Sequence, residues 1–345
     1  MIRRGTLNLC LFAFVLAAFS VAHAQKDPAP AKESAVPVLT ITTARDPVDK
    51  SYRRMVLGME LFEKNHHIAP QAPLRFKLLP RHKGTDMSRI GVEIAGDTFA
   101  IPVKVADDST FTLERIQKAL DEDASVRSNR KALTMTWRAE IRSPGLPPDT
   151  RRLGDLRLEC AVGMEADLVS NRFSALQRIA DLLGATRNYC NRAKPRYFFF
   201  AERPVFAVTL VSGARREPVL IDMLYAGALD RPLTERELAT CDCEVLLDRA
   251  FYLPLGDRSW PDDTRVELEY MPGAAPADDA YRTFVGATRA QVRAAFGEAT
   301  VLRFEGGYEL WAYDFGPPQR PRLAHDELVL LFDRSDVVRA TRLRQ

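Results

Sequence analysis

The sequence predicts an α+β protein, with a β-rich antiparallel body that carries two main helices and a small C-terminal domain of element order ααβββ(β). Short runs in which apolar and polar residues alternate recur along most of the chain, as expected for half-buried strands. Two longer stretches repeat apolar residues at helical spacing. A segment of small residues and prolines, 272–279, separates a last group of helix and strand patterns from the body and predicts a linker. Antiparallel sheets with helices to one side define this class.

The first residues form a pattern typical of a secretory signal peptide. Arg3 and Arg4 precede an apolar run over 7–21, and a small-x-small motif ends at Ala24. We expect cleavage after Ala24 and a periplasmic protein without a transmembrane span, because a spanning helix needs about 20 apolar residues. Residues 25–37 are rich in proline, alanine and charge, which predicts a disordered linker.

The charge balance argues against nucleic-acid binding. The chain of 345 residues has 49 Lys and Arg against 46 Asp and Glu. Residues 1–24 hold two of the arginines and no acid, so 47 basic residues oppose 46 acidic residues after cleavage. A balance this close leaves no overall electrostatic footprint for a nucleic acid. The apolar fraction of 46% is that of a globular protein with a full core.

The body is expected to span residues 38–271 and to begin with a strand and a helix. Residues 38–43 alternate in the manner of a strand. Asp46 can cap the helix that follows, Pro47 suits its first turn, and apolar residues then recur every three or four positions. The second main helix is predicted over 165–185 from the same spacing.

The rest of the body is predicted to consist of short strands. They are expected at 74–79, 89–94, 98–105, 132–141, 154–162, 196–200, 205–213, 217–224, 243–248 and 264–271. The short turn after the second of these strands, and Ser212-Gly213 after the seventh, each predict a hairpin. Whether the body is one domain or two stays open.

Four cysteines follow the signal peptide, namely Cys160, Cys190, Cys241 and Cys243. An even number of cysteines in an exported chain predicts two disulfides. Zinc is the competing interpretation, but structural zinc sites usually combine two closely spaced ligand pairs, which Cys160 and Cys190 do not form. A bridge between Cys241 and Cys243 would be tight. We therefore favour the pairs Cys160–Cys243 and Cys190–Cys241, although spacing alone does not fix the connectivity.

The sequence contains no catalytic constellation that we can identify. Ser128 and Lys131 match the Ser-x-x-Lys of penicillin-recognising enzymes, but that chemistry needs the serine at a helix N-terminus with the lysine one turn later. Here the match lies beside a predicted strand, and no Lys-Thr-Gly occurs. The aromatic runs at 197–200 and 251–260 suit either a binding platform or core packing, and core packing is favoured. We expect no enzymatic activity, no metal and no cofactor.

The C-terminal domain, 280–345, shows orderly helix and strand signals. Thr288 and Gln291 predict a capping box, Val292 lies on the inner helical face, and Gly286 and Gly297 punctuate the helices. A strand at 301–304 is followed by an alternating strand over 308–315 and by a final hairpin. The alternation puts Tyr308, Leu310 and Ala312 on one face and Glu309, Trp311 and Tyr313 on the other.

This arrangement resembles the SmpA/OmlA (BamE-like) domain of Gram-negative outer-membrane assembly proteins. The residues that carry the resemblance are Gly286, Thr288, Gln291, Val292, Phe296, Gly297, Trp311, Tyr313, Phe332 and Asp333. The resemblance is confined to residues 280–345, and the chain lacks the lipidated cysteine of that family. Ala299 also stands where proline is usual. The resemblance implies a non-enzymatic docking role at the periplasmic side of the outer membrane, with Tyr308 as a further docking candidate.

Two functional hypotheses follow from these patterns. The first is an exported, non-enzymatic envelope protein whose C-terminal domain docks on an envelope or outer-membrane protein. The alternative is a periplasmic protein whose body binds or hydrolyses a cell-wall ligand, with an accessory C-terminal domain. The sequence does not identify the partner, the ligand or the oligomeric state.

Overall fold

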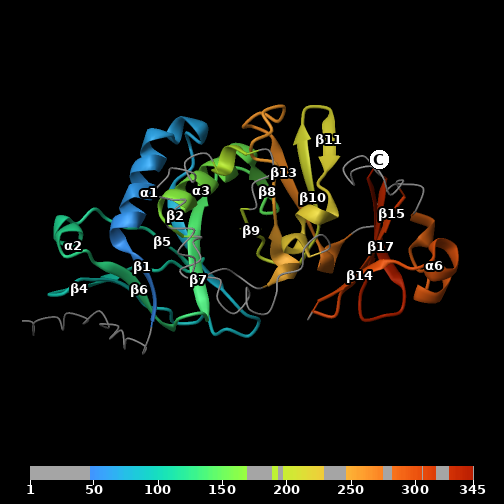
Figure 1. Ribbon diagram of the computed structural model, residues 1–345, viewed down its shortest axis with the longest axis horizontal. Coiled ribbons are helices and arrows are strands. Elements are labelled where there is room, and N and C mark those ends of the chain that lie inside the picture. Colours follow the sequence, from blue (N-terminus) through green and yellow to red (C-terminus); the bar gives the residue numbers. More distant parts are fainter. Residues whose placement is uncertain are drawn as a thin grey trace, which may run out of the picture. The chain divides into compact units, whose positions relative to one another are not determined.

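The computed structural model describes residues 47–168, 189–192, 197–228, 246–274, 282–304, 306–315 and 326–344. These residues form four α-helices and seventeen strands, and every strand pair among them is antiparallel (Figure 1). The predicted α+β class is therefore confirmed. The predicted signal peptide, the linker at 25–37 and the strand at 38–43 lie outside the described residues, as do Cys241 and Cys243.

The first helix begins later than the sequence predicts. Pro47–Ser51 forms strand β1, and helix α1 covers Tyr52–Lys64. Ser51 is the N-cap, and its hydroxyl accepts from the N–H of Arg54 at 3.4 Å. The apolar residues of β1 continue the helical spacing by coincidence. Val48 is buried because it points inward from a strand. The predicted capping residue, Asp46, lies outside the described residues.

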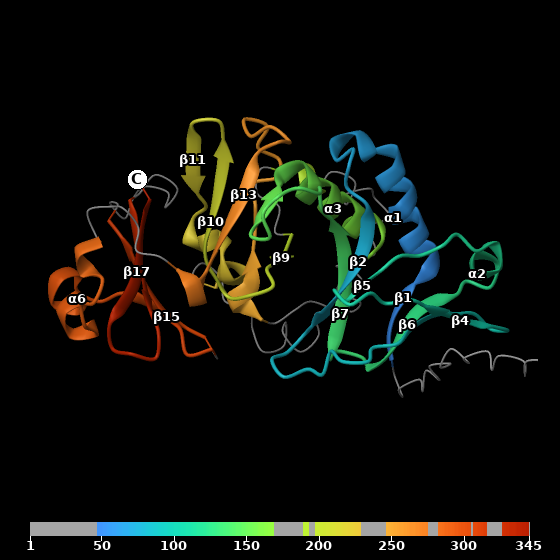
Figure 2. The same cartoon turned by 180° about the vertical axis from the view of Figure 1, so that it is seen from behind.

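Two sheets pack with α1 in the first part of the chain (Figure 2). In spatial order, the first consists of β1, β6 (Ser125–Lys131), β3 (Val92–Ala95) and β4 (Ala100–Val103). The second consists of β5 (Thr110–Phe111), β2 (Leu74–Pro80) and β7 (Met135–Ile141). The predicted hairpin is present as β3 and β4, and a short helix, α2 (Gln117–Asp121), precedes β6. One hydrophobic cluster, with Trp137 at 0% exposure, joins these elements.

Residues 153–165 form a helix where the sequence predicts a strand. Helix α3 covers Leu153–Glu165. Leu156 belongs to one hydrophobic cluster and Leu158 to another, so α3 lies between two cores. A helix buried on all sides has no single apolar stripe, and its sequence therefore lacks the helical period. Of the helix predicted over 165–185, only residues 165–168 are described: Glu165 ends α3, and Asp167, with a φ of 55°, lies in the turn that follows.

The middle of the chain forms a second β-rich layer beside α3. Its four-stranded sheet has the order β11 (Arg215–Pro218), β10 (Val205–Ser212), β13 (Arg265–Tyr270) and β8 (Thr150–Arg152). A short ribbon pairs β9 (Phe199–Phe200) with β12 (Ala250–Phe251). The hairpin predicted across Ser212-Gly213 is present. The strand predicted over 217–224 ends earlier, because Ile221–Met223 forms a 3-10 turn.

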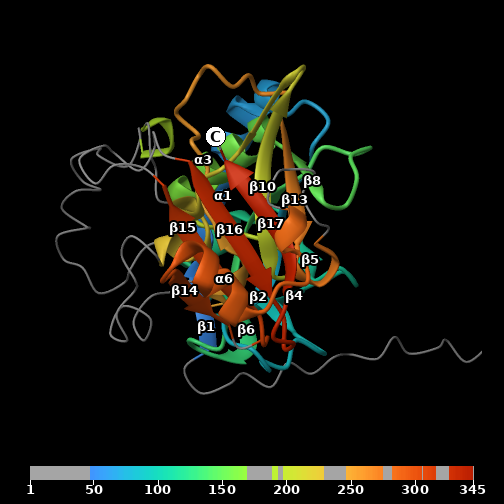
Figure 3. The same cartoon turned by 90° about the vertical axis from the view of Figure 1, so that its right-hand side faces the viewer.

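The described C-terminal residues form a 3-10 turn, a helix and four strands. They are η7 (Arg282–Phe284), α6 (Arg289–Phe296), β14 (Thr300–Arg303), β15 (Glu309–Asp314), β16 (Glu327–Phe332) and β17 (Val338–Arg344). The four strands pair in chain order as an antiparallel sheet, and Figure 3 shows β15, β16 and β17 side by side. Trp311 packs with Val292 of α6, whereas Leu310 on the opposite face belongs to the core of β10 and β13.

Candidate functional site

A cavity of 240 Å³ lies over the sheet formed by β5, β2 and β7. Its other walls come from β9 and the residues around it, from Glu159 in the middle of α3 and from β13. Its lining includes Lys77, Leu79, Arg138, Glu140, Arg142, Arg151, Glu159, Tyr197, Phe198, Phe199, Phe200, Glu202, Arg249 and Tyr270. They come from distant parts of the chain, so the fold alone brings them together.

The floor of the cavity follows from strand alternation. In β7, Trp137 and Ala139 point into the hydrophobic cluster under α1, so Arg138 and Glu140 face the other side of the sheet. Arg138 lies opposite Lys77 of β2 in the register. The sequence predicted this strand but gave no sign that its second face was covered, because a charged face of an antiparallel strand normally meets water.

One wall of the cavity is aromatic. Tyr197, Phe198, Phe199 and Phe200 all contribute to it. The rings of Tyr197 and Phe199 are 5.0 Å apart, and Phe198 stacks on Tyr252 at 4.9 Å. Neighbouring rings hold one another by packing and by their quadrupoles, which gives the wall a defined shape.

Arg138 is held against this wall. Its side chain is buried, with the residue 5% exposed. The guanidinium carbon lies 5.0 Å from the ring centroid of Phe200 and 5.9 Å from that of Tyr197. Both distances are within the range of a cation–π contact, which is stronger when water is excluded. The aromatic wall therefore positions a positive charge at the cavity.

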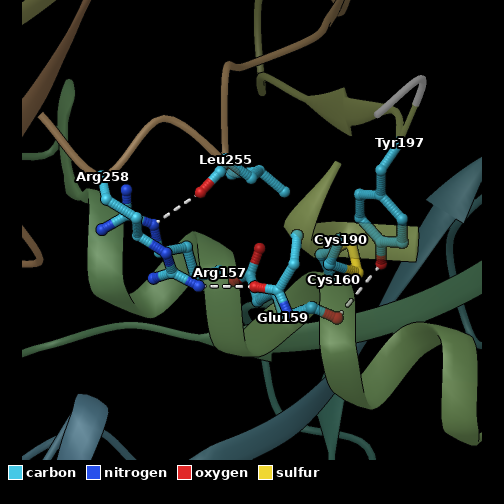
Figure 4. Close-up of a disulfide and its surroundings, with 8 residues drawn as sticks. Arg157, Glu159, Cys160, Cys190, Tyr197, Leu255 and Arg258 are labelled. Carbon is cyan, nitrogen blue, oxygen red and sulfur yellow. Dashed lines mark hydrogen bonds between the residues drawn. A yellow bond between two sulfur atoms is a disulfide. The ribbon is translucent and has the colours of Figure 1, made fainter. Parts of the chain in front are cut away.

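A buried ion pair closes the end of the cavity beneath α3. Glu159 pairs with Arg151 and accepts a hydrogen bond from the N–H of Ile141 at 2.7 Å. Burial raises the pKa of the Glu159 carboxyl to about 7, and the nearby Arg151 opposes this rise. The main-chain oxygen of Glu159 also accepts from the hydroxyl of Tyr197 at 3.3 Å, which ties the aromatic wall to the helix (Figure 4).

Three further cations stand around the cavity, each held by a main-chain oxygen. Lys77 donates to the carbonyl of Asp108 at 2.5 Å. Arg142 donates to Pro148 at 2.7 Å, and Arg249 donates to Glu202 at 2.9 Å. A neutral carbonyl fixes such a side chain in place without cancelling its charge.

The disulfide joins two elements next to the cavity. Cys160 of α3 is bonded to Cys190 of the turn η2 (Tyr189–Asn191), with 6.0 Å between their Cα atoms (Figure 4). The predicted pairs Cys160–Cys243 and Cys190–Cys241 are therefore wrong. They rested on the expectation that a Cys241–Cys243 bridge would be tight, whereas the fold brings Cys160 of α3 next to Cys190 of η2. Cys160 directly follows Glu159, so the disulfide fixes α3 at the end of the cavity.

The Ser-x-x-Lys match has no catalytic geometry. Ser128 and Lys131 lie on strand β6, where an odd spacing directs side chains to opposite faces. Ser128 is buried, and its hydroxyl accepts from the N–H of Arg130 at 3.2 Å. The strand therefore separates the two side chains instead of bringing the amine to the hydroxyl.

The docking candidates of the C-terminal domain have structural roles at its helix. Thr288 and Gln291 form the predicted capping box, and Val292 is fully buried under α6. Gly286 and Gly297 adopt φ values of 87° and 80°, a region in which a side chain is disfavoured.

The aromatic candidates of the same domain also make internal contacts. The Trp311 indole N–H donates to Glu309, and the Tyr313 hydroxyl donates to the carbonyl of Gly297 at 3.2 Å. Tyr308 packs against the core that β10 and β13 share with this sheet. These candidates therefore lie at one helix and one sheet, and none of them lines the cavity.

Comparisons with protein-family models, with curated proteins and with solved structures give no match for this chain. Within the described ranges, no helix is long and apolar enough to cross a membrane. The same ranges contain no cluster of three or more His, Cys, Asp or Glu side chains with metal-binding geometry.

Proposed function

We propose that the protein is a non-enzymatic binding protein of the cell envelope and that the cavity beside β9 is its ligand site. The observation that carries this proposal is the aromatic wall of a 240 Å³ cavity with a few fixed polar groups. Small-molecule sites in proteins are concave and mostly apolar, and a small number of placed polar groups orient the ligand. Of the two hypotheses drawn from the sequence, this proposal corresponds to the second, in which the body binds a ligand, but it does not include hydrolysis of that ligand.

Binding suits the polar groups of the cavity better than catalysis. The Tyr197 hydroxyl donates to a main-chain oxygen of α3, and the Glu159 carboxylate is engaged by Arg151 and by a main-chain N–H. A general acid or base must instead reach a substrate proton. The disulfide between Cys160 and Cys190 supports an oxidising compartment, in agreement with the expected signal peptide.

Docking of the C-terminal domain on an envelope protein stays a prediction. The residues that carry the family resemblance serve the helix cap, the turns and the core of this domain. Such roles are compatible with docking but do not point to a docking surface. The proposal therefore rests on the cavity, and the C-terminal domain is assigned a structural role.

The proposal is tested by titrating the protein with N-phenyl-1-naphthylamine, a neutral aromatic probe whose fluorescence rises in apolar sites. We expect saturable binding, because the probe can pack against the aromatic wall. Leu79→Trp should abolish this binding by filling the cavity that Leu79 lines. Ile101→Trp is the matched control, since Ile101 is 37% exposed on strand β4 and does not line the cavity. Equal binding by both variants would place the probe elsewhere and contradict the proposal.

A further inference from the structure

We propose that strand β14 is an interaction surface for a second copy of this chain, and that two copies pair edge to edge along β14 about a two-fold axis at Leu302. The proposal does not involve the cavity and goes beyond the proposed function. Three observations carry it, namely the outward main-chain groups of β14, the protection of other sheet edges, and the register in which β14 can pair with itself.

Strand β14 stands at the end of the C-terminal sheet, beside β15. The N–H of Phe304, directly after β14, donates to the carbonyl of Tyr308 at 3.0 Å, so these two residues form a hydrogen-bonded pair. Hydrogen-bonded and non-hydrogen-bonded pairs alternate along an antiparallel ladder. Leu302 therefore bonds to β15, whereas the main-chain groups of Val301 and Arg303 point away from it. Within the described part of the chain, these outward groups have no hydrogen-bond partner.

The opposite edge of the same sheet is covered at one end. Val338 of β17 accepts a hydrogen bond from the N–H of Gly286 and donates one to the carbonyl of Ala287, both at 2.9 Å. The segment before α6 therefore occupies main-chain groups that β17 would otherwise present at the edge. Strand β14 receives no such cover from the described residues.

Two edge strands elsewhere in the chain are protected by proline. Pro102 lies on β4 and Pro218 on β11, and the hydrogen bonds of each hairpin place both at positions whose N–H would point away from the sheet. Proline there removes a donor that an added strand needs, which is one way in which proteins prevent edge-to-edge pairing. Strand β14 contains no proline, and Arg303 is its one charged residue.

The register of β14 allows it to pair with a copy of itself. A two-fold axis at Leu302 places this residue opposite the same residue of the second copy. Val301 then lies opposite Arg303 of the second copy, so the outward residues of each strand meet the outward residues of the other. Antiparallel pairing of this kind exchanges N–H and C=O bonds at both positions. Such an interface is closed by symmetry, because each copy contributes the same surface.

The side chains brought together in this register are complementary on both faces of the sheet. On the face toward the main core, Leu302 and Leu310 of one copy continue into the same two residues of the other, which forms one row of leucines. On the face toward α6, Arg303 lies between Glu309 of its own chain, at 3.1 Å, and Val301 of the second copy. Like charges are therefore not directly opposed, as a stable cross-strand pair requires.

The first test is sedimentation velocity of the intact protein over a concentration series. We expect a reversible monomer–dimer equilibrium. Arg303→Pro removes an outward N–H from each copy but leaves the bonds between β14 and β15, so it should raise the dissociation constant of the dimer roughly tenfold or more. Arg303→Ala is the matched control, because it removes the same exposed side chain and keeps the N–H. It should leave the equilibrium nearly unchanged.

A cross-link provides a second measurement that does not depend on proline. Residues of a non-hydrogen-bonded antiparallel pair have Cα atoms about 4.5 Å apart, within the span of a disulfide. Leu302→Cys should therefore give, under mild oxidation, a peptide that is linked through position 302 of both copies. Val301→Cys is the control, because Val301 faces Arg303 of the second copy and not its own equivalent.

The possible results decide the proposal in either direction. A protein that stays monomeric at every concentration overturns it. A dimer that Arg303→Pro weakens no more than Arg303→Ala forms through another surface and also overturns it. If Arg303→Pro fails to fold, the cross-link decides: linkage through position 302 supports the proposal, and no linkage, or equal linkage for Val301→Cys, contradicts it.

Discussion

At the scale of single residues, the cavity contains charged side chains that are removed from water and stabilised by neighbouring side chains. Arg138 is packed against aromatic rings, and Glu159 is paired with Arg151. Isolated buried charges are strongly unfavourable, so each such group needs a partner. Glu159 is nevertheless poorly solvated, and this has a measurable consequence for stability.

The Glu159 carboxyl should make stability fall as pH rises toward neutrality. Burial raises its pKa from 4.5 to about 7 in the folded protein, and Arg151 opposes this shift. Between these pH values the folded state holds a proton that the unfolded chain has lost. The contribution of this group is therefore full below pH 4.5 and is lost as pH rises to 7. The shift corresponds to an upper bound of about 3 kcal/mol.

Urea unfolding checks this prediction. The free energy of unfolding is measured for the wild-type protein and for Glu159→Gln at pH values below 4.5, between 4.5 and 7, and above 7. We expect the wild type to lose stability relative to the variant across that window. Both proteins retain groups such as Asp108, whose pKa is lowered mainly by a hydrogen bond from the Thr110 side chain. Such groups make stability rise with pH, and their contribution cancels in the difference between the wild type and the variant. A difference that does not change with pH would contradict the assignment.

At the scale of secondary-structure elements, α3 is the centre of the body. Its Leu156 and Leu158 enter different cores, and its Cys160 is bonded to η2. Gly163 on the same helix faces the Tyr197 ring, because a Cβ built there would come within 2.3 Å of the Tyr197 hydroxyl. Helix α3 therefore sets the position of the aromatic wall as well as the packing of both layers.

Loss of the disulfide should destabilise the protein and loosen this end of the cavity. Cys160 and Cys190 are 30 positions apart, and closing a loop of this length restricts the unfolded chain by about 3–4 kcal/mol in the entropic account. We expect Cys160→Ala with Cys190→Ala to lower the free energy of unfolding by this order, as measured in urea without reductant. Peptide mapping of the oxidised protein should recover the Cys160–Cys190 pair, and a Cys160–Cys243 peptide would contradict the structure.

The elements differ in how far the sequence predicts them, for physical reasons. The C-terminal helix was predictable because Thr288, Gln291 and Gly297 act within a few residues of one another. Strand β15 was predictable because a run rich in apolar and aromatic residues follows the turn residues Gly306 and Gly307. Helix α3 was not, because burial on all sides removes the periodicity. The cavity could not be predicted, because Arg138, Tyr197 and their neighbours share no local pattern and meet only in the fold.

At the scale of the whole molecule, the C-terminal sheet is part of the main core. Leu310, Val329 and Leu331 are fully buried in the cluster that contains the residues of β10 and β13. Glu327 accepts from the N–H of Ile221 at 3.2 Å, which adds a polar contact between the two regions. A sheet covered by α6 on one face and by this core on the other stabilises the protein as a whole.

Removal of the C-terminal sheet should therefore unfold the middle of the chain. A buried leucine is worth roughly 2–5 kcal/mol, so the loss of Leu310 and Leu331 with their neighbours approaches the whole stability of a typical domain. We expect a chain that ends at Pro272 to lose cooperative urea unfolding. Leu331→Ala and Leu330→Ala are a matched pair, since Leu330 faces α6 instead. Hydrogen exchange in β10 should accelerate only in Leu331→Ala, and unchanged unfolding of the shortened chain would contradict this view.

The most direct test of the ligand site is a crystal structure of the protein soaked or co-crystallised with N-phenyl-1-naphthylamine. The account predicts density for one molecule in the cavity, with an aromatic ring against the wall from Tyr197 to Phe200. A saturated crystal in which the cavity holds no ligand, or in which the ligand binds only at another surface, would contradict the central claim.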